Sequence, residues 1–149
     1  MVIHIIAVLV LGLMCGSELS IAVFAHPVLN RQPIEAHIPV RAALAALLGR
    51  VMPFWFAVST LLNLVILFPL GRLTGSAWNL ALIAFCIQVA AVVFSLVFPV
   101  PINNRIRVWT VGALPADWKQ DEQRWDAYHS WRTVAIIAAF VLLTVSLNR

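Results

Sequence analysis

Four long apolar stretches constrain the fold of this chain more than any other feature. They cover residues 2–24, 51–70, 77–98 and 128–147 of a 149-residue sequence. About 20 helical residues cross the roughly 30 Å hydrocarbon core of a bilayer. Hydrophobic residues make up 62% of the chain and charged residues 11%, whereas soluble domains carry about 25% charged residues. The sequence therefore predicts an all-α polytopic membrane protein, with four transmembrane helices in a single domain. It excludes a soluble enzyme, a disordered tail and a nucleic-acid binder.

The last apolar stretch is too short to span a membrane by itself. Its fully apolar part, residues 133–147, has 15 residues, or roughly 22 Å of helix. The fourth helix must therefore recruit residues from its N-terminal side, which places Tyr128, His129 and Arg132 at the membrane edge. Residues 116–132 have a helical composition, so we expect helix 4 to extend beyond the membrane on the cytoplasmic side.

Prolines bear on the predicted conformation of two segments between the spans. Residues 40–49 are apolar and rich in alanine, and they either extend the second helix or form a short interfacial helix before Pro53. Pro99 and Pro101 are predicted to end the third helix, because proline lacks the N–H group that a helix interior needs. We expect them to hold the following segment extended as it leaves the membrane.

Basic residues are unevenly distributed between the two sides of the predicted bundle. Four spans place the connections 25–50 and 99–132 on one side, and both termini and the 71–76 turn on the other. The two connections carry eight Lys and Arg residues and the other side carries two. The positive-inside rule then places both termini on the non-cytoplasmic side of the membrane, which is the inner membrane if the protein is bacterial.

An acidic residue lies inside the first span. A buried carboxylate such as that of Glu18 is costly in a bilayer, and by default it indicates a functional site with a partner. His26 follows eight residues later, and the spacing of four through Ala22 predicts that both side chains look into the same side of the bundle. In the alternative interpretation, a protonated Glu18 bonds a neighbouring helix and His26 marks the headgroup boundary.

A polar and aromatic stripe runs along the fourth helix. Trp118, Trp125, His129 and Arg132 recur at spacings of seven, four and three, which predicts one helical face. Arg124 lies on a second line beside it. Tryptophan and arginine are also typical of membrane interfaces, and that alternative applies most strongly to the two tryptophans.

The topology brings these residues to one membrane face. Helix 1 and helix 3 leave the membrane there and helix 4 enters it, so Glu18, His26, His129 and Arg132 lie at similar depth. Asn103 and Asn104 follow the two prolines and can turn back over the bundle, although asparagine is also an ordinary turn residue. We therefore expect a small-molecule pocket at one end of a four-helix bundle.

These motifs together carry a family resemblance. The sequence resembles the anthrone oxygenase-like family of membrane proteins in Glu18, His26-Pro27, Pro101-Ile102-Asn103-Asn104, Trp109, Trp118, Arg124-Trp125, His129 and Arg132. The resemblance covers almost the whole chain and implies a four-helix membrane protein. Characterised members oxidise an anthrone to an anthraquinone with molecular oxygen, so it also implies an oxidoreductase acting as a monooxygenase on a small hydrophobic aromatic substrate that is anthrone- or quinol-like.

The catalytic roles follow from that chemistry. A base that removes the acidic proton of an anthrone makes an anion able to react with oxygen, and His129 or His26 is suited to that step. Arg132 is predicted to stabilise the developing oxyanion. Glu18 is predicted to orient a histidine or to act as the base itself.

Five further residues are predicted to bind the substrate. Carboxamides could assist the oxyanion, and indole rings could stack on flat rings. The set consists of Asn103, Asn104, Trp109, Arg124 and Trp125.

Two other classes of function stay open at this point. Glu18, His26 and His129 are a two-histidine, one-carboxylate set, the ligand type of non-haem iron sites; copper, zinc or axial ligation of a haem are further options. No cofactor is required by the sequence. Alternatively, the chain is a non-catalytic membrane subunit that binds a partner or lipid, in a homo-oligomer or a larger membrane complex.

Overall fold

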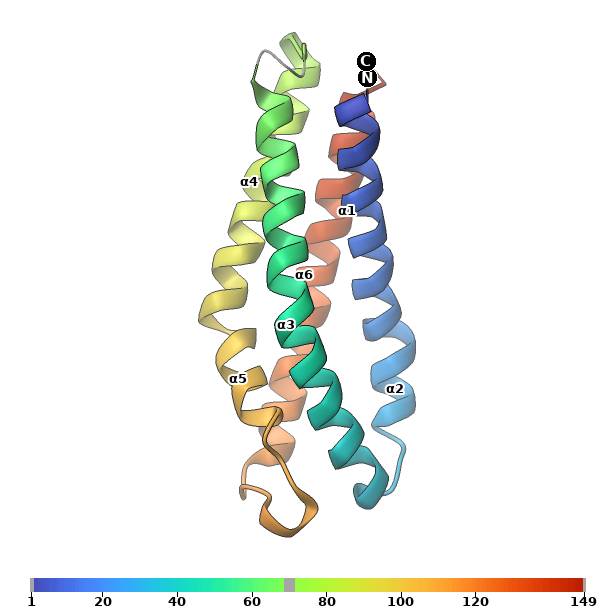
Figure 1. The fold of residues 1–149 in the computed structure, drawn as a ribbon, viewed down its shortest axis with the longest axis vertical. Coiled ribbons are helices and arrows are strands. Elements are labelled where there is room, and N and C mark those ends of the chain that lie inside the picture. The colour runs from blue at the N-terminus through green and yellow to red at the C-terminus, as the bar shows by residue number, and fades with distance from the viewer. Residues whose placement is uncertain (1, 69–71, 149) are drawn as a thin grey trace.

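The protein consists of long helices running along one axis (Figure 1). The computed structural model describes residues 2–68 and 72–148. Four of its helical segments, Val2–Leu29, Ile34–Leu67, Gly75–Val97 and Trp118–Ser146, are long and apolar enough to cross a membrane, which confirms the predicted all-α four-helix membrane bundle. In chain order the elements are α1 (Val2–Ser20), the π-helical turn η1 (Ile21–Ala25), α2 (His26–Leu29), α3 (Ile34–Leu67), α4 (Gly75–Val97), α5 (Pro99–Ile106), the 3-10 turn η3 (Val111–Ala113) and α6 (Trp118–Ser146).

Two helices are longer than the apolar stretches within them. Helix α3 starts at Ile34, so residues 40–49 extend the second helix and do not form a separate interfacial one. Helix α6 starts at Trp118 and continues unbroken to Ser146. The predicted span limits describe where the chain enters and leaves the membrane. Helix bounds do not fix those positions, so the span limits stay predictions. The end of the second span at residue 70, and residue 71 of the predicted turn, lie outside the described residues.

The chain reverses direction between each pair of neighbouring long helices. Figure 1 shows the N- and C-terminal ends together with the end of α3 and the start of α4. Helices α2 and α5 and the first turns of α3 and α6 lie at the opposite end, which we call the α5 end. This is the arrangement expected for four spans, with the two long connections on one side.

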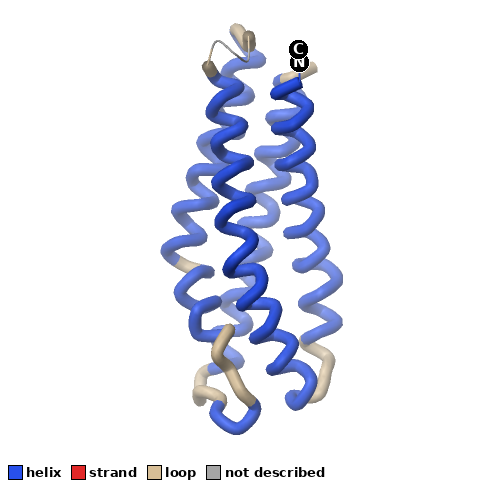
Figure 2. Tube along the Cα trace, in the orientation of Figure 1, coloured by secondary structure: helices blue, strands red, loops and turns tan. Residues whose placement is uncertain are grey.

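The prediction of an extended segment after the third helix is wrong. Pro99–Ile106 forms helix α5, with proline in its first turn, where the missing N–H costs nothing because it would have no partner within the helix. Figure 2 shows the short non-helical break between α4 and α5. The prolines therefore end one helix and begin the next, and the new helix turns Asn103 toward α3.

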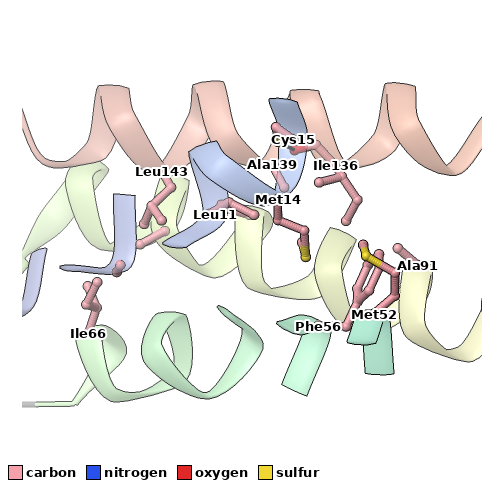
Figure 3. Packing of buried hydrophobic residues seen from close by; sticks show 13 residues of the cluster. Leu11, Met14, Cys15, Met52, Phe56, Ile66, Ala91, Ile136, Ala139 and Leu143 are labelled. Carbon is pink, nitrogen blue, oxygen red and sulfur yellow. Dashed lines mark hydrogen bonds between the residues drawn. The ribbon is translucent and has the colours of Figure 1, made fainter. Parts of the chain in front are cut away.

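The core is apolar and is built from all four long helices. Figure 3 shows Leu11 and Met14 of α1 packed against α6, with Phe56 of α3 nearby. Fully buried alanines such as Ala84 and Ala139 let α4 and α6 approach closely, as small residues do in membrane bundles. Many outward-facing side chains are also large and apolar, such as Phe54 and Leu61, as expected for a surface in contact with lipid.

A second, smaller apolar cluster lies at the α5 end. It packs α3 against α5 and α6. Two buried tryptophans belong to it, one on α6 and one just after α5. Its buried members are Ile38, Ala45, Ile102, Ile106, Trp109 and Trp125.

Candidate functional site

A buried ion pair joins the first and last helices. Glu18 of α1 is 0% exposed, and its carboxylate accepts two hydrogen bonds from Arg132 of α6, from Nε at 3.0 Å and from Nη2 at 2.9 Å. A paired, bidentate geometry of this kind offsets part of the large cost of removing both charges from water. The sequence-predicted acid and guanidinium therefore meet, although they are 114 positions apart.

Helices α3 and α4 complete the surroundings of this pair. Arg132 Nη1 donates to Ser95 Oγ of α4 at 3.3 Å, and Ser95 Oγ donates in turn to the Ala91 carbonyl at 2.6 Å. The Arg132 guanidinium carbon lies 5.1 Å from the ring centroid of Phe56 on α3, within the range of a cation–π contact. All four long helices thus hold one guanidinium in place.

His129 lies one turn before Arg132 and is less constrained by hydrogen bonds. Its Nε2 is 3.4 Å from Glu18 Oε2, and its ring stacks on Trp125 with centroids 5.0 Å apart and planes 18° apart. Among the described residues, neither ring nitrogen has a hydrogen-bond partner, although the side chain is buried. Buried polar atoms are usually paired, so the two ring nitrogens of His129 are exceptions within this cluster.

A π-helical turn places His26 beside His129. Eight residues of regular α-helix would leave His26 about 80° out of line with Glu18. The His26 N–H bonds the Ile21 carbonyl five residues back. This extra residue in the turn reduces the offset to about 20°. The His26 ring is 5.1 Å from the rings of both His129 and Trp125.

The far side of His26 faces a carboxylate. Its Nδ1 lies 3.4 Å from Asp126 Oδ1, and Asp126 also pairs with Arg41 and accepts a hydrogen bond of 2.9 Å from Asn30 Nδ2. The two histidines therefore form a line from Glu18 to the partly exposed Asp126 near the α5 end.

A cavity of about 540 Å³ lies next to this cluster, between α3 on one side and α4 and α5 on the other. This volume is within the usual range for small-molecule sites. Most of its wall is apolar, from residues such as Met52, Phe56 and Val92. Six of the predicted site residues line it: Glu18, Asn103, Asn104, Trp125, His129 and Arg132.

Several polar atoms that belong to the cavity wall have no partner among the described residues. Besides the His129 nitrogens they are Thr60 Oγ1, Asn103 Oδ1 and Trp125 Nε1. Burying such atoms without a hydrogen bond is unfavourable. They are therefore candidate contacts for the polar groups of a ligand.

Asn103 is held in position by α3. Its Nδ2 donates to the Ala45 carbonyl at 2.9 Å, and Gly49 allows the close approach, since a Cβ at Gly49 would lie only 2.9 Å from that same nitrogen. Gly49 was not predicted as a site residue. A glycine in an alanine-rich helix, four positions after Ala45, is the signal that could have indicated it.

Three of the predicted residues lie away from the large cavity. His26 lines a small adjoining pocket with Arg41. Trp109 packs in the second apolar cluster, with its ring 6.0 Å from Trp118, and Arg124 is exposed on α6. Among the residues described, neither Trp109 nor Arg124 contacts the cavity, so their predicted roles would require a substrate that reaches beyond it.

Three ion pairs at the α5 end were not predicted from the sequence. Each joins an acid in the first turns of α6 to a base on α3 or α5, and we call them the terminal ion pairs. They are Arg41–Asp126, His37–Glu122 and Arg105–Asp121. Arg41 is the one charged residue in the apolar stretch 40–49, and that isolation is the signal that could have indicated a buried partner.

The Arg105–Asp121 pair differs from the other two in exposure. Arg105 Nε and Nη2 each donate to the Asp121 carboxylate at 2.7 Å, while the Arg105 side chain remains 52% exposed. The hydrogen bonds to Asp121 raise the pKa of the Arg105 guanidinium above its already high usual value. Arg105 therefore stays charged at all physiological pH values.

The three predicted metal ligands face other protein groups in this arrangement. Both carboxylate oxygens of Glu18 bind Arg132, and Nδ1 of His26 faces Asp126. In the part of the chain that the structure describes, no three His, Cys, Asp or Glu side chains are placed to hold a metal ion. The metal and haem alternatives stay predictions.

The fold and the site define an integral membrane protein of four helices that encloses a largely apolar cavity with an ion pair and an imidazole at its inner wall. A family model described as anthrone oxygenase matches residues 43–142, which is more than half of the chain. The chain therefore belongs to the anthrone oxygenase family. The matched range includes His129 and Arg132, whereas Glu18 and His26 precede it. Comparison with curated proteins and with solved structures gave no match.

Proposed function

We propose that the protein is a membrane oxygenase that oxidises a flat, lipid-soluble aromatic substrate of the anthrone or quinol type. The observation that carries this proposal is the imidazole of His129, which has no hydrogen-bond partner among the described residues and lines a 540 Å³ cavity beside the Glu18–Arg132 pair. Membership of the anthrone oxygenase family supports the same chemistry. Fold and family alone do not set a substrate, so the residues must carry the mechanism.

His129 is the proposed general base. In its neutral form an imidazole accepts a proton at one ring nitrogen, which suits removal of an acidic C–H proton near neutral pH. The resulting anion transfers electrons to molecular oxygen and forms a C–O bond, giving a hydroperoxide. Loss of water then breaks the O–O bond and the second C–H bond, and leaves a carbonyl group. In an anthrone one O₂ is consumed, and the products are one quinone and one water.

Arg132 is the proposed donor to the substrate oxygen, and the second N–H of the Asn103 amide can assist it, whereas the unpaired Asn103 Oδ1 is an acceptor. Deprotonation moves negative charge onto that oxygen, where fixed donors lower the barrier. Three N–H groups of Arg132 are engaged by Glu18 and Ser95, and the remaining ones can donate to a ligand, because a guanidinium carries five. Glu18 then has a positioning role: it orients Arg132 and balances its charge.

Trp125 is the proposed platform for the substrate rings. Its indole lines the cavity, stacks on His129 and has the Arg41 guanidinium carbon 5.1 Å from its ring centroid. A flat substrate ring would contact the part of the indole that these two side chains leave free, close to the base. Aromatic pairs of this kind contribute about 0.5–1.5 kcal/mol beyond the burial of their area.

The deciding experiment replaces the base. We expect His129→Asn to lower the rate of anthraquinone formation from anthrone by roughly 10²- to 10⁴-fold, with little change in the thermal unfolding temperature in detergent. Oxygen uptake and quinone absorbance measure the reaction. His4→Asn is the matched control, because His4 lies on α1 near the opposite end of the bundle, and it should keep full activity. Wild-type activity in His129→Asn would overturn the mechanism. Absence of any turnover in the wild type would instead favour a non-catalytic membrane subunit.

The proposed orientation places the α5 end in the cytoplasm and both termini outside. The eight Lys and Arg residues in the two long connections support it. Labelling of single cysteines introduced near each end, with a membrane-impermeant thiol reagent on intact cells and on inverted vesicles, tests the orientation. Labelling of the terminal end from the cytoplasmic side would reverse it.

A further inference from the structure

One flank of the cavity is bounded by side chains that also face the surroundings of the bundle. Ala57 and Leu61 of α3 line the cavity and are exposed, and Leu61 is 58% exposed. Val93 and Leu96 of α4 also line it and are 55% and 63% exposed. A residue that both lines a cavity and is exposed marks its rim, so the cavity opens sideways between α3 and α4. We call Ala57, Leu61, Val93 and Leu96 the lateral rim. Gly49, Pro53, Val89 and Asn104 also line the cavity and are exposed, and Asn104 lies at the α5 end of the opening.

The lateral rim lies in the apolar part of the bundle. All four of its side chains are hydrocarbon, and they belong to the membrane-crossing portions of α3 and α4. Lipid chains therefore contact this opening, and water does not. The Glu18–Arg132 pair lies at the inner wall of the same cavity, so polarity increases from the rim inward.

At the α5 end the inner wall of the cavity is packed, whereas its outer edge reaches the exposed Asn104 of α5. Beyond Trp125 and Asn103 lies the second apolar cluster, which includes the buried Ile38 and Ile106. The Arg41–Asp126 and His37–Glu122 pairs join α3 to α6 at the same end. A ligand moving along the bundle axis from this end would have to break this packing, so entry here is also sideways, between α3 and α5 past Asn104.

The other end of the cavity is closed by the main core. Leu11 and Met14 of α1 and Ile66 of α3 are almost fully buried in the cluster that joins all four long helices. Close packing of this kind leaves no route along the bundle axis. The opening between α3 and α4 is therefore the route into the cavity that disturbs packed side chains least.

We infer that the cavity is loaded from the bilayer through the lateral rim, by a flat aromatic molecule dissolved in the lipid that moves inward with its oxygen-bearing group leading. The nature of this ligand rests on the proposed function, whereas the route rests on the rim itself. A phospholipid acyl chain is the competing occupant. A chain would place methylene groups against His129, Asn103 and Trp125 and leave their polar atoms unpaired, which is unfavourable.

The test measures how fast an aromatic probe is loaded, independently of turnover. The wild-type protein and variants are placed in phospholipid nanodiscs, and binding of anthraquinone is followed by stopped-flow quenching of tryptophan fluorescence. Leu61→Trp would add tryptophan signal, so the rim is narrowed with Leu61→Phe and Val93→Phe. It is widened with Val93→Ala.

We expect the association rate to fall about tenfold or more in the narrowed variants, with a smaller change in equilibrium affinity, and to rise in Val93→Ala. Leu13→Phe and Val134→Phe are matched controls, because they are 66% and 63% exposed and do not belong to the cavity lining. They should load at the wild-type rate. Unchanged rates in the narrowed variants, equal slowing in the controls, or no binding of anthraquinone by the wild type would overturn the inference.

A second measurement separates the two occupants. Phospholipids with brominated acyl chains are used in the same nanodiscs without probe, and the fluorescence of wild type and Trp125→Phe is compared. Quenching of the component assigned to Trp125 would show that an acyl chain fills the cavity, and would overturn the choice of occupant. Normal loading of anthraquinone without turnover of anthrone would defeat the proposed function and leave the lateral route standing.

Discussion

The bundle contains two sets of charged and ionisable side chains, which differ in whether their polar atoms are paired. At the cavity, Glu18 and Arg132 are paired, but the neighbouring His129 has no hydrogen-bond partner among the described residues. At the α5 end, the terminal ion pairs match each acid of α6 with a base of α3 or α5. The first set faces a 540 Å³ space and the second faces packed side chains.

The difference shows how a membrane protein can use ionic groups for a site and for its own assembly. The terminal ion pairs join α6 to α3 and α5. In the cavity set both ring nitrogens of His129 lack a partner among the described residues, whereas in the terminal ion pairs only Arg41 Nη1 does. Removing one partner of a buried ion pair is costly, because it leaves the other charge buried and unpaired. The same kind of substitution should therefore change stability by different amounts in the two sets.

The largest effect is expected from Arg132→Met. It leaves the Glu18 carboxylate buried without its cation, which should destabilise the protein by about 3–5 kcal/mol and abolish oxidation. Chemical unfolding in detergent, followed by circular dichroism, measures the loss. The double variant Glu18→Leu with Arg132→Met should recover part of that stability, since the orphaned charge is gone. A double variant no more stable than the single one would contradict the ion-pair interpretation.

An intermediate effect is expected from Glu122→Gln. This change removes the charge that faces His37 and Lys119 and should cost about 1–3 kcal/mol of stability. Anthraquinone affinity should remain within a few-fold of wild type, because Glu122 does not line the cavity. Isothermal titration together with thermal unfolding checks both parts. Loss of binding at unchanged stability would place Glu122 in the ligand site and remove the contrast between the two sets.

The smallest effect is expected from Arg105→Ala. Its side chain is half exposed, so solvent screens its bond to Asp121, and such pairs contribute about 0–1 kcal/mol. Arg107→Ala, at a nearby exposed position, is the control for loss of a surface cation. Comparison of unfolding at low and high salt isolates the ionic part, which salt should reduce. A loss of several kcal/mol would mean that this pair is as important as the buried ones.

Much of the architecture could be predicted because bilayer physics leaves few choices. Long apolar stretches must become helices, as every backbone polar group needs a partner within lipid. The predicted convergence of Glu18, His129 and Arg132 followed from topology, since three helix ends meet on one face. The same reasoning could not anticipate helix α5, because Pro99 and Pro101 are equally compatible with an extended segment and with the first turn of a helix.

Side-chain partners were harder to anticipate than helices. Arg41 and Asp126 are 85 positions apart, and no local pattern links them. The π turn before His26 changes the direction of that side chain without any change in hydropathy. Gly49 matters only because Asn103 of α5 approaches α3 at that point.

The sequence by itself determined that this chain lies in a membrane, that it crosses it as four helices, and that an acid, two histidines and an arginine share one end. Hydrophobicity and helical rise suffice for that, because each acts over neighbouring residues. Only the tertiary structure decided which side chains pair, which stay unpaired, and where the cavity opens. Those outcomes depend on the rotation of each helix about its axis and on how closely helices pack, and both result from contacts between residues far apart in the chain.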